Sequence, residues 1–293
     1  MGQLAWFDRL GKRLAEVGQP FDLWDISPEI SPDGTKFAVT KFEGGNIDVW
    51  VHNLARDVTQ RITFDPAIDQ FPIWSPDGKR IVFSSSRAGH YDLYIIGANG
   101  EGREELLYAS SENKIPTSWS ADGRFILFDT EAGSAKSGIW VLPMEGTGKH
   151  TPAPLVHTRA NERQGVFSPD SRWIAYESNA SGKPDVYVQP FAFPPTRSED
   201  GPRVLLSRGG GMVPHWRADG KELLYSAPDG TLMSAAMTTV GALHPGVPQS
   251  LFHLGGFWWD ATADGNQFLV GVPVEQGVPP FTVVLNWQTE WKK

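Results

Sequence analysis

The sequence predicts an all-β fold, a single β-propeller built from four-stranded antiparallel blades. Three observations predict it: a Ser-Pro-Asp-Gly turn or a close variant recurs along the chain, its aspartates are 44 to 49 residues apart, and the residues between two turns form four short strand-like stretches. The turn aspartates are Asp33, Asp77, Asp122, Asp170, Asp219 and Asp264. A period of about 45 residues with four strands per repeat is typical of a propeller blade.

The second repeat shows the plan of one blade. Its four predicted strands are residues 70–74, 80–84, 91–96 and 105–108. Residues 75–78 turn the chain between the first two strands, because Pro fixes φ, Asp can bond its own backbone and Gly accepts a positive φ. Ser171 replaces the Gly of this turn in the fourth repeat. If Ser171 has a positive φ, the strain costs about 1 kcal/mol.

The residue before each turn is apolar in every repeat. These residues are Ile30, Trp74, Trp119, Phe167, Trp216 and Ala261. Their regular position at the end of a first strand predicts a ring of side chains that pack as wedges between neighbouring blades.

The number of turns favours six blades, with seven as the alternative because the strand-like stretches slightly exceed what six blades need. Residues 1–17 are similar to the third and fourth strands of a blade, and residues 257–293 begin a blade without completing it. We expect these two ends to form one closing blade together, which removes the open sheet edges of the ring. Residues 281–287 are expected to be a further strand of that blade. Residues 1–293 then form a single propeller domain.

Composition excludes several classes of protein. A net charge of −8 argues against a nucleic-acid binder and against binding to anionic membranes. The absence of cysteine excludes a disulfide framework and a thiolate metal site. The sequence has no signal peptide and no apolar run of transmembrane length. We therefore expect a monomer without membrane insertion, either a cytoplasmic protein or an excised domain of a larger one.

The repeat carries a family resemblance. Residues 71–78, followed by a strand and by residues 91–94, resemble the PD40 or WD40-like repeat of the TolB propeller family, and the similarity extends over nearly the whole chain. Residues 3–12, 63–66 and 285–287 are similar to the propeller that follows the kinase domain in certain soil-bacterial Ser/Thr protein kinases. The sequence lacks the glycine-rich and H-R-D loops of a kinase. The resemblance implies a sensor, ligand-binding or protein-docking propeller.

A binding site is expected where loops converge at one mouth of the central channel. The loops between second and third strands share this face with the loops between blades, whereas the Ser-Pro-Asp-Gly turns lie on the opposite face, so the turn aspartates are predicted to be structural. The converging segments carry charges that form either an ordinary solvated rim or a polar funnel for a protein partner or small ligand. The candidate binding residues are Asp65, Asp69, His90, Glu112, Lys114, Glu131, Glu162, Arg163 and His215.

No linear motif indicates catalysis. The sequence contains neither a G-x-S-x-G nor an H-E-x-x-H motif, and no cofactor is predicted. A site for a divalent metal stays an open alternative, because Asp65 and Asp69 share one loop and histidines of different repeats could come together in the fold. We favour a non-catalytic recognition or sensor propeller. The alternative is a metal-assisted lyase or hydrolase whose site is assembled from several blades. Three or more of the following around one point would favour the enzyme: Asp69, His90, Glu112, Glu162, Arg163 and His215.

Overall fold

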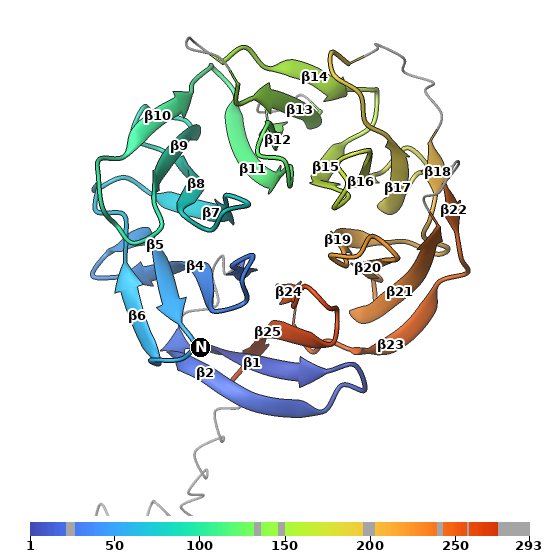
Figure 1. Cartoon of the computed structure of the whole chain (residues 1–293), viewed down its shortest axis with the longest axis horizontal. Helices are drawn as coiled ribbons and strands as arrows, with labels where there is room; N and C mark the ends of the chain where they lie inside the picture. Colours follow the sequence, from blue (N-terminus) through green and yellow to red (C-terminus); the bar gives the residue numbers. More distant parts are fainter. Residues whose placement is uncertain are drawn as a thin grey trace, which may run out of the picture.

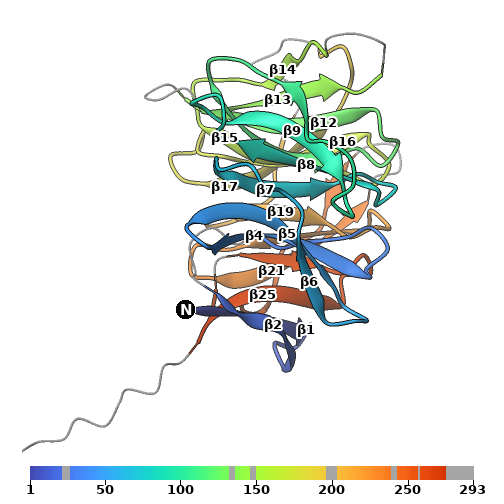
Figure 2. The same ribbon diagram turned by 90° about the vertical axis from the view of Figure 1, so that its left-hand side faces the viewer.

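The protein is a six-bladed β-propeller, as the sequence predicts, with no seventh blade among the residues described (Figure 1). The computed structural model describes residues 1–21, 27–131, 136–145, 150–195, 203–238, 243–256 and 258–274. Six antiparallel sheets are arranged around a common axis, and their strands run from one face of the disc to the other (Figure 2). No helix within these ranges could span a membrane.

Five blades follow the chain in order, each from its inner to its outer strand. Blade 1 contains β3 (Glu29–Ile30), β4 (Lys36–Glu43), β5 (Asn46–Asn53) and β6 (Val58–Arg61). Blade 2 contains β7 (Asp69–Trp74), β8 (Arg80–Ser85), β9 (Asp92–Gly97) and β10 (Glu105–Tyr108). Blade 3 contains β11 (Asn113–Trp119), β12 (Phe125–Glu131), β13 (Gly138–Pro143) and β14 (Ala153–Val156). Blade 4 contains β15 (Glu162–Phe167), β16 (Trp173–Ser178), β17 (Asp185–Pro190) and β18 (Val204–Leu205). Blade 5 contains β19 (Met212–Trp216), β20 (Glu222–Ser226), β21 (Thr231–Thr238), β22 (His244–Pro245) and β23 (Gln249–His253).

The closing blade is formed by both ends of the described chain. Its order from the inside is β24 (Trp259–Ala261), β25 (Gln267–Pro273), β1 (Gly2–Asp8) and β2 (Arg13–Phe21). β1 pairs antiparallel with β25 along its whole length, from Gly2 opposite Pro273 to Asp8 opposite Gln267. The N-terminal strands are therefore the third and fourth of this blade, as predicted. The strand expected at residues 281–287 lies outside the described residues.

The turn motifs are structural, as predicted. In four turns a Ser hydroxyl donates a 2.6 Å hydrogen bond to the Asp two residues later; the pairs are Ser31–Asp33, Ser75–Asp77, Ser120–Asp122 and Ser168–Asp170. Thr262 replaces Ser in the pair with Asp264. The bond from Ser75 and the N–H of Lys79 hold the pKa of Asp77 below its usual value. Ser171 has a φ of 54°, so the fourth turn adopts the same left-handed backbone conformation as the other turns. This conformation is strained for a residue with a Cβ atom.

Each residue that precedes a turn contributes to a different one of six apolar clusters between neighbouring blades, which confirms the predicted ring of wedges. The clusters differ in size. The wedge between the closing blade and blade 1 has four buried members, whereas the other five have between six and ten. Among the described residues, the wedge between the closing blade and blade 1 therefore has the fewest fully buried members, and five partly buried apolar residues pack against them.

Candidate functional site

A cavity of about 430 Å³ lies in the middle of the ring. The inner strands of all six blades contribute to its lining. Its apolar wall consists largely of aromatic and proline side chains, namely Phe71, Tyr91, Trp258, Trp259, Pro28, Pro72, Pro116 and Pro214. We call this cavity the central channel. Its volume lies in the range of ligand-binding pockets, and its rigid lining requires few side chains to be ordered on binding.

Bulges in three inner strands shape the wall of the channel. Phe71, Gln164 and Val213 have φ values between 52° and 55°, and the strand register shifts at each of them. The bulge turns the backbone N–H away from its own sheet and toward the preceding blade. Thus Phe71 donates to Thr40 Oγ1 at 3.1 Å, and Gln164 donates to Asp129 Oδ2 at 2.8 Å. Val213 donates to Gln164 Oε1 at 3.0 Å, so polar contacts join successive blades around the channel.

Asp129 is the most unusual acid of the channel. Only 4% of the residue is exposed, and its Oδ1 atom has no hydrogen-bond partner among the described residues. Burial raises the pKa of Asp129 to about 8, although the N–H of Gln164 and the charge of Arg163 oppose the shift. The raised pKa favours the protonated, uncharged form of this carboxyl group at neutral pH.

A second acidic group lies on the wall formed by blade 1 and the closing blade. Burial, and next the negative charge of Asp260, raise the pKa of Glu29 well above its usual value. Asp260 accepts a 2.6 Å hydrogen bond from the N–H of Ile30, and its Oδ1 lies 3.2 Å from His215 Nδ1. The ring of His215 lies 4.6 Å from that of Trp259, whose indole nitrogen is buried without a partner among the described residues. This wall thus contains a carboxyl group with a raised pKa and, beside His215, an indole N–H that is buried.

Sequence reasoning did not find Asp129 or Glu29 as site residues. One signal was available for Asp129. It is the sixth residue after the turn Gly, a position occupied by Thr40, Ser84 and Ser226 in three other blades. A polar residue that recurs in the middle of a second strand indicates a partner in the next blade.

Three of the nine predicted site residues line the channel, and they are Glu131, Arg163 and His215. Arg163 Nη2 lies 3.5 Å from Glu131 Oε1, and both side chains are well exposed. An exposed pair of this kind contributes little to stability, so its charges are available to a ligand at low cost.

Asp65 and Asp69 surround Arg87 outside the channel. Arg87 Nη2 lies 3.2 Å from Asp69 and 2.6 Å from Glu104, while Nη1 lies 3.7 Å from Asp65. Burial raises the pKa of the fully buried Asp69 to about 6 despite the neighbouring arginine. Because the guanidinium group of Arg87 forms ion pairs with all three carboxylates, it anchors the segment that contains Asp65 and Asp69 to blade 2.

The remaining four predicted residues also lie outside the channel lining. Lys114 is completely buried, with Nζ 2.6 Å from Asp92 Oδ1 and hydrogen bonds to three backbone carbonyls, including that of Glu112. His90 lies 3.8 Å from the same aspartate. Glu162 is fully buried and accepts a 2.5 Å hydrogen bond from the hydroxyl of Thr158. These side chains therefore make contacts within the protein that stabilise the loops next to β9, β11 and β15.

The structure gives the enzyme hypothesis little geometric support. Of the six side chains whose convergence would favour an enzyme, only Arg163 and His215 line the channel. Within the described ranges, no three His, Asp or Glu side chains are placed so that they could hold a metal ion.

Comparison with known proteins agrees with this architecture. Residues 9–139 match the sequence profile of the TolB beta propeller domain, PD40, which confirms the resemblance to the TolB propeller repeat. The similarity to kinase-linked propellers stays a prediction. The Tol-Pal system protein TolB of Alcanivorax borkumensis is 34% identical over 91 residues, which cover 30% of this chain and 20% of that protein. The structure of a putative TolB from Agrobacterium tumefaciens superimposes with a TM-score of 0.72 at 19% identity and covers 93% of this chain and 99% of that one. This structural likeness shows the fold.

A relative of another kind is the uncharacterized peptidase YuxL of Bacillus subtilis. It is 25% identical over 206 residues, which cover 55% of this chain and 31% of the peptidase. The chain thus matches between a fifth and a third of the length of these two curated relatives. The likeness concerns a part of the peptidase only, and this chain has no G-x-S-x-G nucleophile motif.

Proposed function

We propose that this chain is a non-catalytic recognition propeller that binds an extended segment of a protein partner in the mouth of its central channel. The observation that carries the proposal is the central channel itself, a cavity of about 430 Å³ to whose lining the inner strands of all six blades contribute. Similarity to TolB-type propellers supports a protein-interaction role.

The chemistry of the channel suits a peptide. Aromatic and proline walls can pack against apolar side chains, while the partly exposed side chains of Arg163 and His215 can bond the polar groups of an extended backbone. Glu131 and Arg163 at the rim can select the charge of flanking residues. A small ligand with the same groups is the other occupant that this lining would accept. The proposal includes a monomer without a nucleic-acid partner, consistent with a net charge of −8.

Selection from a display library of random linear peptides tests the proposal. Peptides enriched on the wild-type protein are then measured against Ile115→Trp, which fills the channel next to Asp129, and against Leu106→Trp on the exposed outer strand β10. We expect at least a tenfold weaker binding to Ile115→Trp and unchanged binding to Leu106→Trp. Peptides that bind all three proteins equally, or a library that yields none, would contradict a peptide-binding channel.

A further inference from the structure

At several positions of the central channel, the backbone offers no N–H donor to a ligand. The bulges turn the N–H groups of Phe71, Gln164 and Val213 toward the preceding blade, where each has an acceptor. Proline, which lacks an N–H group but keeps its carbonyl, occupies four further positions of the lining, namely Pro28, Pro72, Pro116 and Pro214. The backbone of the lining therefore has an excess of carbonyl acceptors over available N–H donors.

The charged side chains of the lining show a similar imbalance. These side chains are Glu29, Asp129, Glu131, Arg163 and His215. Arg163 lies beside Glu131, and His215 lies beside Asp260, so each basic group already has an acid next to it. Among the described residues, neither Glu29 nor Asp129 forms an ion pair, and Oδ1 of Asp129 also lacks a hydrogen-bond partner. The channel thus contains two acids without a basic group beside them.

Glu29 is the acid of this pair that a ligand can reach. It is partly exposed and lines the channel, whereas Asp129 is buried in the wall. Removal of the Glu29 carboxyl group from water, and next the charge of Asp260, raise its pKa, and no cation opposes them. A cation in the channel would supply the missing countercharge and favour the ionised carboxylate.

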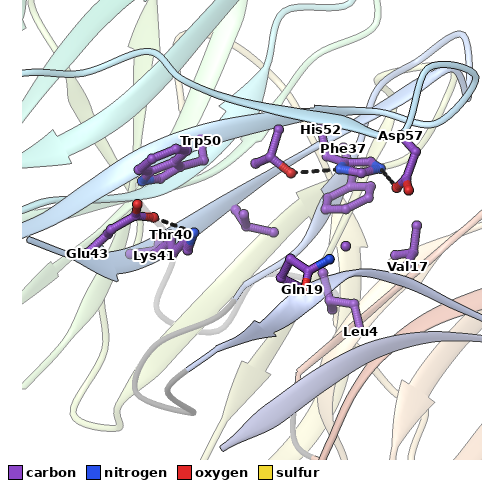
Figure 3. Close-up of a pocket in the computed structure, with 13 residues that line it drawn as sticks. Leu4, Val17, Gln19, Phe37, Thr40, Lys41, Glu43, Trp50, His52 and Asp57 are labelled. Carbon is purple, nitrogen blue, oxygen red and sulfur yellow. Dashed lines mark hydrogen bonds and ion pairs between the residues drawn. The ribbon is translucent and has the colours of Figure 1, made fainter.

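The acids of a second cavity are balanced in a way that Glu29 is not. This cavity, which we call the seam groove, has a volume of about 370 Å³ and lies between the closing blade and blade 1 (Figure 3). Glu43 forms an ion pair with Lys41 there, and Asp57 lies 3.5 Å from Nε2 of His52. The missing counter-cation is therefore a property of the channel and does not extend to the seam groove.

The aromatic wall of the channel suits an organic cation. Phe71, Tyr91 and Trp258 are partly exposed in the lining. The faces of aromatic rings attract ammonium and guanidinium groups, and apolar surface packs against the alkyl stem of lysine or arginine. A metal ion needs several ligand groups around one point, which the described His, Asp and Glu side chains do not provide.

We infer that the central channel recognises a cationic side chain of its partner segment, a lysine or an arginine whose charge faces Glu29 within the aromatic wall. Carbonyl groups of the lining supply acceptors for the N–H donors of that side chain. The inference rests on the proposed function, because it specifies the chemistry of the segment that enters the channel.

Chemical-shift titration of the isotope-labelled protein with two blocked amino acids tests the inference. The probes are acetyl-lysine N-methylamide and acetyl-norleucine N-methylamide, which share an apolar stem and differ by the ammonium group. We expect the wild-type protein to bind the lysine probe about tenfold or more tightly than the norleucine probe. Ile115→Trp, which fills the channel, should abolish binding of the lysine probe.

Two substitutions of glutamate by glutamine provide the matched comparison for this titration. Glu29→Gln keeps the size of the side chain in the channel and should remove most of the preference for the lysine probe. Glu43→Gln makes the same change in the seam groove and should leave the preference unchanged. Equal binding of the two probes by the wild-type protein, no binding of either probe, or a preference that Glu29→Gln retains would overturn the inference.

Peptides selected on the wild-type protein provide a second measurement. We expect them to be enriched in basic residues, and replacement of the lysine by norleucine should weaken binding to the wild-type protein far more than binding to Glu29→Gln. If selected peptides bind in the channel but tolerate this replacement, the inference fails and the proposed function stands. If the channel prefers the lysine probe but no peptide is selected, the proposed function fails and the cation site stands.

Discussion

The turns and the central channel of this propeller shift the pKa of an aspartate in opposite directions. In the turn of blade 2, Asp77 is exposed and accepts hydrogen bonds from Ser75 and Lys79, which lower its pKa. In the channel, Asp129 is buried with one oxygen unpaired, and its pKa is raised to about 8. The comparison separates an acid that stabilises the fold through its hydrogen bonds from an acid whose burial is unfavourable to the fold and shifts its pKa.

The largest expected effect is the pH dependence caused by Asp129. The pKa of Asp129 is higher in the folded state than in the unfolded state, so the folded state binds more protons. The stability that this bound proton contributes is fully present below the unfolded pKa and is lost as the pH rises toward 8. Between about pH 5 and pH 8 the free energy of unfolding should fall by up to about 1.4 kcal/mol per pH unit. Asp129→Asn resembles the protonated acid and should flatten this slope, as urea denaturation across the range can show.

Other titrating groups face Asp129 and must be considered in that experiment. Arg163 lowers its pKa, whereas Glu177 and Glu131 raise it, and burial also raises the pKa of Glu177. Glu177→Gln is therefore the matched control and should remove a smaller part of the slope. An unchanged slope in Asp129→Asn would contradict the assignment of a neutral carboxyl group to the channel.

A smaller effect is expected in the turns. Asp77→Ala removes the acceptor of the Ser75 hydroxyl and of the Lys79 N–H, and it should destabilise the protein by about 1 kcal/mol at pH 7. The lowered pKa of Asp77 means that its contribution is present above the unfolded pKa and is lost as the solution becomes more acidic. Asp77→Asn keeps an acceptor and should be milder. If Asp77→Ala lowered the free energy of unfolding equally at pH 7 and at pH 3, the ionised form of Asp77 would not be the source of the stabilisation.

The smallest effect concerns Ser171, which has a φ of 54° where the other turns have Gly. Ser171→Gly should relieve backbone strain and raise the free energy of unfolding by at most about 1 kcal/mol. Ser171→Ala keeps a Cβ atom and should bring no gain. Thermal unfolding of the three proteins provides the comparison, and a loss of stability in Ser171→Gly would mean that the strain is offset by side-chain contacts of Ser171.

Local features of the molecule could be predicted from sequence because their causes lie within a few residues. Ser75, Asp77 and Gly78 form one turn whatever the rest of the chain does, and six copies of that turn indicate six blades. The pairing of β1 with β25 was predictable for a related reason, since each end contains part of a blade and open edges are unfavourable.

The site depends on contacts between blades, which a linear pattern does not contain. Burial raises the pKa of Asp129, and the N–H that opposes this shift comes from a bulge at Gln164 in the next blade, 35 residues away. The sequence predicts Lys114 to be a cation of the rim, yet Lys114 lies at the start of β11 and is buried against Asp92. Its burial depends on a partner 22 residues away, which the local sequence does not indicate.

Hydrogen exchange followed by mass spectrometry, with and without a display-selected peptide, locates the surface that the peptide covers. If the channel is the binding site, exchange should slow in the segments that line it on β11 and β15 and stay unchanged in the outer strands β10 and β14. Slower exchange confined to the outer strands, with the inner strands unaffected, would contradict recognition through the channel.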